Sequence, residues 1–199
     1  GLFDLEGQQV QLVTNQAGNC LHGGVTGFDK LRWKIVEQAA QRVTFSFQSP
    51  DGDQGFPGNL SVSVTYQLDN DGSVSIEYFA HTDKATPVNL TNHAYFNLNG
   101  AGSELDARHH TLNVCSDYYL PTSDVGIPLG ELESVSGTGF DFRVAKSITQ
   151  DLLQDEQQQA AKGYDHSYWF EPNRDRTLPD ASLVSEDSLV TMRVFTDKP

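Results

Sequence analysis

The chain has 199 residues, with 13 Lys and Arg against 27 Asp and Glu, so its formal net charge is −14. A surface this acidic repels nucleic-acid phosphates and anionic lipids, which argues against nucleic-acid and membrane partners. Hydrophobic residues make up 37% of the sequence, which is enough for a buried core, and no apolar run approaches the roughly 18 residues of a membrane span. The only cysteines, Cys20 and Cys115, exclude a disulfide scaffold and favour two free thiols in a reducing compartment.

Alternation of apolar and polar residues predicts strands through most of the chain. In chain order, the predicted strands cover residues 8–14, 31–37, 42–48, 60–68, 74–80, 88–98, 111–115, 164–170 and 189–196. The turn at 69–72 joins two of them as a hairpin. One helix is predicted over 147–159, and 174–188 is expected to be a loop. Many short strands between Gly- and Pro-containing turns predict an all-β fold, a β-sandwich in a single domain over residues 1–199.

The segment 88–98 carries side chains that are unusual for a core. On a strand, His93, Tyr95 and two asparagines, Asn89 and Asn97, share one face. Amides and phenols hydrogen-bond hydroxyl groups, aromatic rings cover C–H surfaces, and a histidine can move a proton near neutral pH. Such a face suits a sugar. The alternative, which alternation alone favours, is an exposed strand face with incidental polar residues.

Two further motifs carry residues suited to chemistry. Residues 21–24 read Leu-His-Gly-Gly, where the glycines let a backbone approach a ligand closely. No G-x-S-x-G nucleophile elbow accompanies this motif, which argues against a serine hydrolase. In the other motif, neighbours Asp165 and His166 face opposite ways on a strand, so one is expected to face a site while the other packs or is solvated. Zinc held by these residues with His22 and His93 is disfavoured, because the spacings are not those of metal ligands.

Together, four ordered motifs resemble the aldose 1-epimerase, or galactose mutarotase, family. They comprise residues 21–24 and 27–30 with Trp33, residues 51–60, residues 91–98, and residues 163–166. The resemblance implies a large antiparallel β-sandwich of the galactose mutarotase-like type with few short helices and the sugar in an open cleft. It also implies interconversion of the α- and β-anomers of aldohexoses such as glucose and galactose, without a metal or a cofactor.

The resemblance also implies roles for individual residues. His93 would deliver a proton to the ring oxygen, and His22 would be a second partner of the ring oxygen or a hydroxyl. Tyr95 would line the site, Asp165 would accept hydrogen bonds from sugar hydroxyls, and Asn92 is assigned to substrate binding with them. We therefore expect His22 and His93 to lie close together in one site.

Two parts of the family pattern have no counterpart within residues 1–199. They are an Asn-Arg pair upstream of Gly1 and a glutamate base downstream of Pro199, so the sequence resembles the interior of a longer enzyme. The alternatives are a non-catalytic sugar-binding β-sandwich and a structural β-domain of a larger carbohydrate enzyme. A phosphorylated sugar is a weaker alternative, because the net charge disfavours an anionic substrate. A cytoplasmic location is expected; the sequence carries no signal for oligomeric state or for glucose over galactose.

Overall fold

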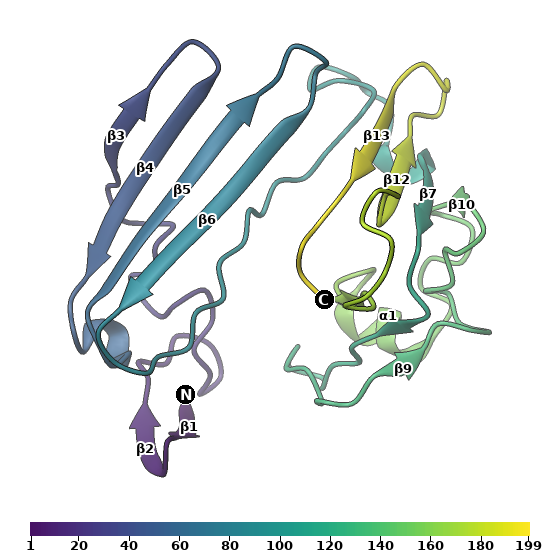
Figure 1. Cartoon of the computed structure of the whole chain (residues 1–199). Helices are drawn as coiled ribbons and strands as arrows, with labels where there is room; N and C mark the ends of the chain where they lie inside the picture. The colour runs from purple at the N-terminus through teal and green to yellow at the C-terminus, as the bar shows by residue number, and fades with distance from the viewer. The chain divides into compact units, whose positions relative to one another are not determined.

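A computed structural model describes residues 1–199, which group into two units, Gly1–His93 and Ala94–Pro199. Strands outnumber helices in both units, and every strand pair is antiparallel, so the predicted all-β antiparallel class is confirmed (Figure 1). None of the helices has the length and apolar character needed to cross a bilayer. The single domain expected over residues 1–199 stays a prediction.

The first unit contains a hairpin and a four-stranded sheet (Figure 1). The hairpin pairs β1 (Leu2–Leu5) with β2 (Gln8–Gln11), and the sheet has the order β3 (Lys34–Gln38), β4 (Arg42–Ser49), β5 (Leu60–Leu68) and β6 (Val74–Thr82). The predicted hairpin around 69–72 is confirmed, since β5 and β6 pair along their whole length. Leu60, Val62 and Val64 are buried, so the apolar face of β5 lies inward as the alternation predicts.

The second unit holds two small sheets. One has the order β10 (Lys146–Ser147), β7 (Thr111–Val114), β12 (Ala181–Val184) and β13 (Thr191–Val194); the other has the order β11 (Tyr168–Trp169), β8 (Tyr118–Tyr119) and β9 (Glu133–Ser134). Its helices are α1 (Glu156–Ala161) and η2 (Ala107–His109). The core forms around Tyr119, Val135 and Phe140, where the Tyr119 and Phe140 rings stack with centroids 4.3 Å apart.

The predicted helix over 147–159 is wrong for most of its length. A strand, β10, occupies Lys146–Ser147, and α1 begins only at Glu156. Asp155 sets this start, because its carboxylate accepts a hydrogen bond from Gln158 N at 2.9 Å and caps the first turn. The predicted loop over 174–188 is wrong where β12 forms, since β7 and β13 pair with it on both sides.

The predicted strand over 88–98 is also wrong. None of its residues joins a sheet, and the chain runs without a helix or strand from the end of β6 to η2. A strand needs a neighbour for its backbone N–H and C=O groups, and alternation of side chains does not supply one. β6 is the edge of its sheet, and the chain after it does not return to pair there. The residues of this segment therefore cannot be assigned to one face by strand geometry.

Candidate functional site

Two histidine rings from distant parts of the sequence lie together in the first unit. The ring centroids of His22 and His93 are 6.2 Å apart, and the ring planes meet at 79°, an edge-to-face contact. Both residues are exposed, so a solute molecule can reach both imidazoles. The proximity expected from the sequence is therefore confirmed, and the chemical roles of the two residues stay predictions.

His22 lies in a tight loop with an unusual backbone. Its φ is 52°, and Gly23 and Gly24 follow with φ of 81° and 99°, so three successive residues have left-handed conformations. Glycine adopts this region freely, but a residue with a Cβ pays about 1–3 kcal/mol to do so. Surrounding contacts must therefore hold His22 in place.

Two amide side chains supply contacts that hold this loop. Asn15 donates from Nδ2 to Leu21 O and Gly24 O, both at 3.0 Å, and its Oδ1 accepts from Leu21 N at 2.8 Å. Gln54, in η1 (Asp53–Gly55), accepts from Thr26 N at 3.2 Å through Oε1. The motif over residues 51–60, which contains Gln54, therefore contacts the loop that carries His22. Asn15 was not singled out by the sequence, although an asparagine shortly before a glycine-rich turn is a known turn signal.

Aromatic packing anchors the far end of the same loop to the sheet. Phe28 and Trp33 pack against Phe47 of β4, with ring centroids 5.4 and 5.8 Å from the Phe47 ring. Trp33 also donates from Nε1 to Phe28 O at 3.0 Å. The loop that carries His22 is therefore tied to the sheet at the end beyond its glycines.

The segment that carries His93 is tied to the same sheet. Asn92 donates from Nδ2 to the Tyr66 hydroxyl at 3.1 Å, and the Tyr66 ring, on β5, packs edge-on against Phe45 of β4. This bond places the residue next to His93 over the sheet. The predicted role of Asn92 in substrate binding stays a prediction.

The other predicted binding residues belong to the second unit. Tyr95 is 88% exposed, and Asp165 is exposed as well. His166 is half-buried, with its ring centroid 4.7 Å from that of Phe140 and its Nε2 3.0 Å from Gln157 Oε1. Burial lowers the pKa of His166. Of the neighbouring pair, His166 therefore packs while Asp165 meets solvent; that Asp165 and Tyr95 bind a sugar stays a prediction.

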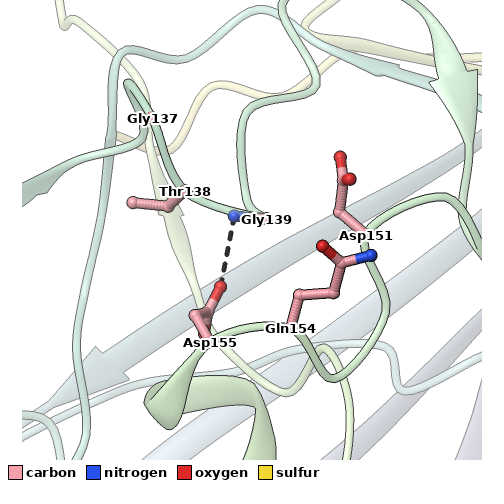
Figure 2. Close-up of a pocket in the computed structure, with 6 residues that line it drawn as sticks. All are labelled: Gly137, Thr138, Gly139, Asp151, Gln154 and Asp155. Atoms are coloured by element: carbon pink, nitrogen blue, oxygen red, sulfur yellow. Dashed lines mark hydrogen bonds between the residues drawn. The ribbon is translucent and has the colours of Figure 1, made fainter.

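A polar pocket in the second unit involves none of the predicted site residues. It has a volume of about 260 Å³ and is lined by Gly137, Thr138, Gly139, Asp151, Gln154 and Asp155 (Figure 2). Asp155 accepts from Gly139 N at 3.2 Å while it caps α1, and Asp151 pairs with Lys146 Nζ at 2.6 Å. The two carboxylates that line the pocket therefore take part in contacts that stabilise the fold. No group of three or more His, Cys, Asp or Glu side chains converges anywhere as a set of metal ligands.

Comparisons with known proteins agree with the motifs. The family model described as aldose 1-epimerase matches residues 1–199. Aldose 1-epimerase from Escherichia coli is 46% identical over 99% of this chain and 56% of its own length, and that from Haemophilus influenzae is 50% identical over 98% and 58%. Galactose mutarotase from Bos taurus is 41% identical over 100% and 56%. The chain spans about half the length of the curated relatives it matches.

Solved structures show the same relationship. The crystal structure of galactose 1-epimerase from Lactobacillus acidophilus superposes with a TM-score of 0.82 at 34% identity, covering 93% of this chain and 54% of that one. A GalM/aldose epimerase homologue from C. elegans superposes with a TM-score of 0.79 at 27% identity, covering 96% and 56%. The predicted galactose mutarotase-like fold is confirmed by these similarities.

Proposed function

The chain belongs to the aldose 1-epimerase family, and we propose that it acts in the interconversion of α- and β-anomers of aldohexoses such as glucose and galactose. The observation that carries this proposal is the edge-to-face contact of two exposed histidines, His22 and His93, at 6.2 Å. Two imidazoles this close can contact neighbouring oxygens of one sugar ring.

The chemistry needs two proton transfers. Opening the ring requires a proton at the ring oxygen and removal of the proton from the C1 hydroxyl; rotation about C1–C2 then lets the ring close on the other face of the aldehyde. An imidazole can give and take a proton near neutral pH. We assign the proton donor to His93 and a second contact with the ring oxygen or a hydroxyl to His22. Tyr95, Asp165 and Asn92 are the proposed sugar-binding residues.

The base that takes the C1 proton is not among these residues. The resemblance assigns that role to a glutamate that has no counterpart within residues 1–199, and we propose that residues 1–199 supply the acid half of the reaction. We therefore expect these residues alone to be a poor mutarotase. A single general acid contributes about 10²- to 10⁴-fold, so its effect on the rate remains measurable.

Polarimetry of freshly dissolved α-D-glucose tests the proposal. We expect the chain to hasten the change in rotation over buffer, by less than an enzyme that also holds the base, and we expect His93→Ala to remove that acceleration. His81→Ala is a matched control, because His81 is an exposed histidine on β6 of the same unit. Sugar binding by the wild type without acceleration would favour a non-catalytic sugar-binding protein. Neither binding nor acceleration would contradict both roles.

We also propose a reducing compartment, such as the cytoplasm, for this protein. Cys20 and Cys115 are both free thiols, and Cys115 is exposed. An exposed thiol persists where glutathione and thioredoxin keep cysteines reduced. Labelling of both thiols in a rapidly quenched cell extract tests this, and recovery of Cys115 in an oxidised form would contradict it.

A further inference from the structure

We propose that Asn15 is the positioning residue that holds His22 against His93. The claim that this positioning affects the rate rests on the proposed function, whereas the claim that Asn15 holds His22 in place does not. Asn15 touches neither histidine ring in the contacts that define its role; it acts on the backbone at both ends of the turn that presents His22.

The side chain of Asn15 brackets His22 in sequence. It bonds both backbone groups of Leu21, the residue before His22, and it bonds the carbonyl of Gly24, two residues after. One planar amide therefore fixes the separation of the two ends of the turn. His22, with φ of 52°, is held between them in a conformation that it would otherwise leave.

The opposite side of the loop is closed by Gln54. Its Oε1 accepts from Thr26 N at 3.2 Å, and its carbonyl accepts from Val13 N at 2.8 Å, which ties the loop to the chain just before Asn15. A Cβ on Gly24 would lie 2.7 Å from Gln54 Oε1, so the two elements are in close contact. The loop thus has amide supports on two sides, of which Asn15 alone spans His22.

This arrangement separates Asn15 from a residue that only stabilises the fold. Asn15 is exposed, so replacing it leaves no cavity in the core. Its loss should free the turn to relax toward ordinary backbone conformations and carry the His22 ring away from His93. A displacement of about 1 Å at a reacting group can cost about 10²-fold in rate.

Two substitutions and a matched control test the inference in the full chain. Asn15→Leu removes all three hydrogen bonds. Asn15→Asp keeps the acceptor for Leu21 N but places a negative charge against the carbonyls of Leu21 and Gly24. The aspartate variant provides the test if the leucine variant does not fold. The control is Asn113→Asp, because Asn113 Nδ2 likewise donates to two carbonyls, Phe142 O at 2.9 Å and Arg143 O at 3.0 Å, in the second unit.

The first readout is the NMR cross-relaxation between the His22 and His93 ring protons, which needs no sugar and no activity. We expect it in the wild type and in Asn113→Asp, and we expect it to be lost in the folded Asn15 variants. Its persistence in those variants, its absence from the wild type, or its equal loss in the control would overturn the inference.

The second readout is the His93-dependent acceleration of anomer exchange. We expect it to fall by about 10- to 100-fold in the Asn15 variants and to be unchanged in Asn113→Asp. A wild type with the ring contact but without acceleration would contradict the proposed function and leave the positioning role supported. A full rate in Asn15 variants that have lost the ring contact would overturn the claim that the reaction needs His22 to be held against His93.

Discussion

Gly27→Ala places a single methyl group against the backbone of His22. Gly27 is buried, and a Cβ built on it would lie 1.9 Å from His22 O and 2.8 Å from Asp29 Oδ1. The flexible carboxylate of Asp29 can rotate away, but a backbone carbonyl moves only if its loop moves. The substitution is therefore a direct test of whether the loop must keep its present shape for His22 to meet His93.

The size of the displacement follows from the geometry. Real Cβ atoms essentially never approach another heavy atom closer than 3.0 Å, so the contact of 1.9 Å must open by about 1.1 Å. Overpacking of this kind costs about 1–3 kcal/mol of stability. A shift of about 1 Å at the neighbouring histidine should lower the His93-dependent rate by about 10²-fold.

Urea unfolding, ring-to-ring cross-relaxation and polarimetry measure the three consequences. Gly102→Ala is the control, because a Cβ on Gly102 meets nothing within 4 Å and its backbone is not left-handed. We expect the control to match the wild type in all three. A Gly27→Ala protein with wild-type stability and an intact contact between His22 and His93 would refute the reasoning that this loop is tightly constrained.

The other predictions concern the proposed proton donor, a buried ion pair and a half-buried histidine. In an intact enzyme that includes the base, His93→Ala should slow anomer exchange by about 10²- to 10⁴-fold. Calorimetry should show a smaller change in sugar affinity, because proton transfer matters mainly in the transition state; equal losses would make His93 a binding residue. Asp180→Asn breaks the ion pair between Asp180 and Arg174, whose side chains are 6% and 13% exposed, so urea unfolding should show a loss of about 3 kcal/mol in the free energy of unfolding. The control Asp117→Asn, at a side chain that is 66% exposed, should lose less than about 1 kcal/mol. Equal losses in the two variants would contradict the role of burial. Burial lowers the pKa of His166 below its unfolded value of about 6.5, so the unfolded chain takes up that proton first as the pH falls. The free energy of unfolding should therefore decrease as the pH drops from 6.5 toward the folded pKa. Urea unfolding at pH 7.5 and at pH 5.5 should show a smaller difference in stability between the two pH values for His166→Phe than for the wild type.

Sequence patterns located the longest strands well. The hairpin of β5 and β6 follows from its alternation and from the turn between its strands, and β4 pairs with β5 across a short connection. Short strands gave weaker signals. β12, at Ala181–Val184, has only four residues, too few for alternation to distinguish it from a loop, although its partner β13 follows closely in the chain.

The helix was misplaced for a different reason. The apolar residues of 147–159 are spaced as on a helix, but the backbone at Leu153 has a φ of 62°, which interrupts any helix through that point. Asp155 then caps a new start. Local capping chemistry therefore overrode the weak hydrophobic period, and an aspartate shortly before a run of helix formers was the signal that mattered.

The proximity of His22 and His93 was predictable, although strand geometry did not produce it. His93 was expected to present its ring from a strand face, yet its segment joins no sheet, and Asn92 fixes it instead through Tyr66 on β5. His22 is presented by a glycine turn that Asn15 holds. Alternation indicates burial against a sheet, whereas these histidines depend on side-chain amides: Asn92 bonds a sheet residue, and Asn15 bonds the backbone of the loop that carries His22. In this chain the residues that build the site are consequently found by asking which polar side chains satisfy the backbone of each loop, and that question leads from His22 to Asn15.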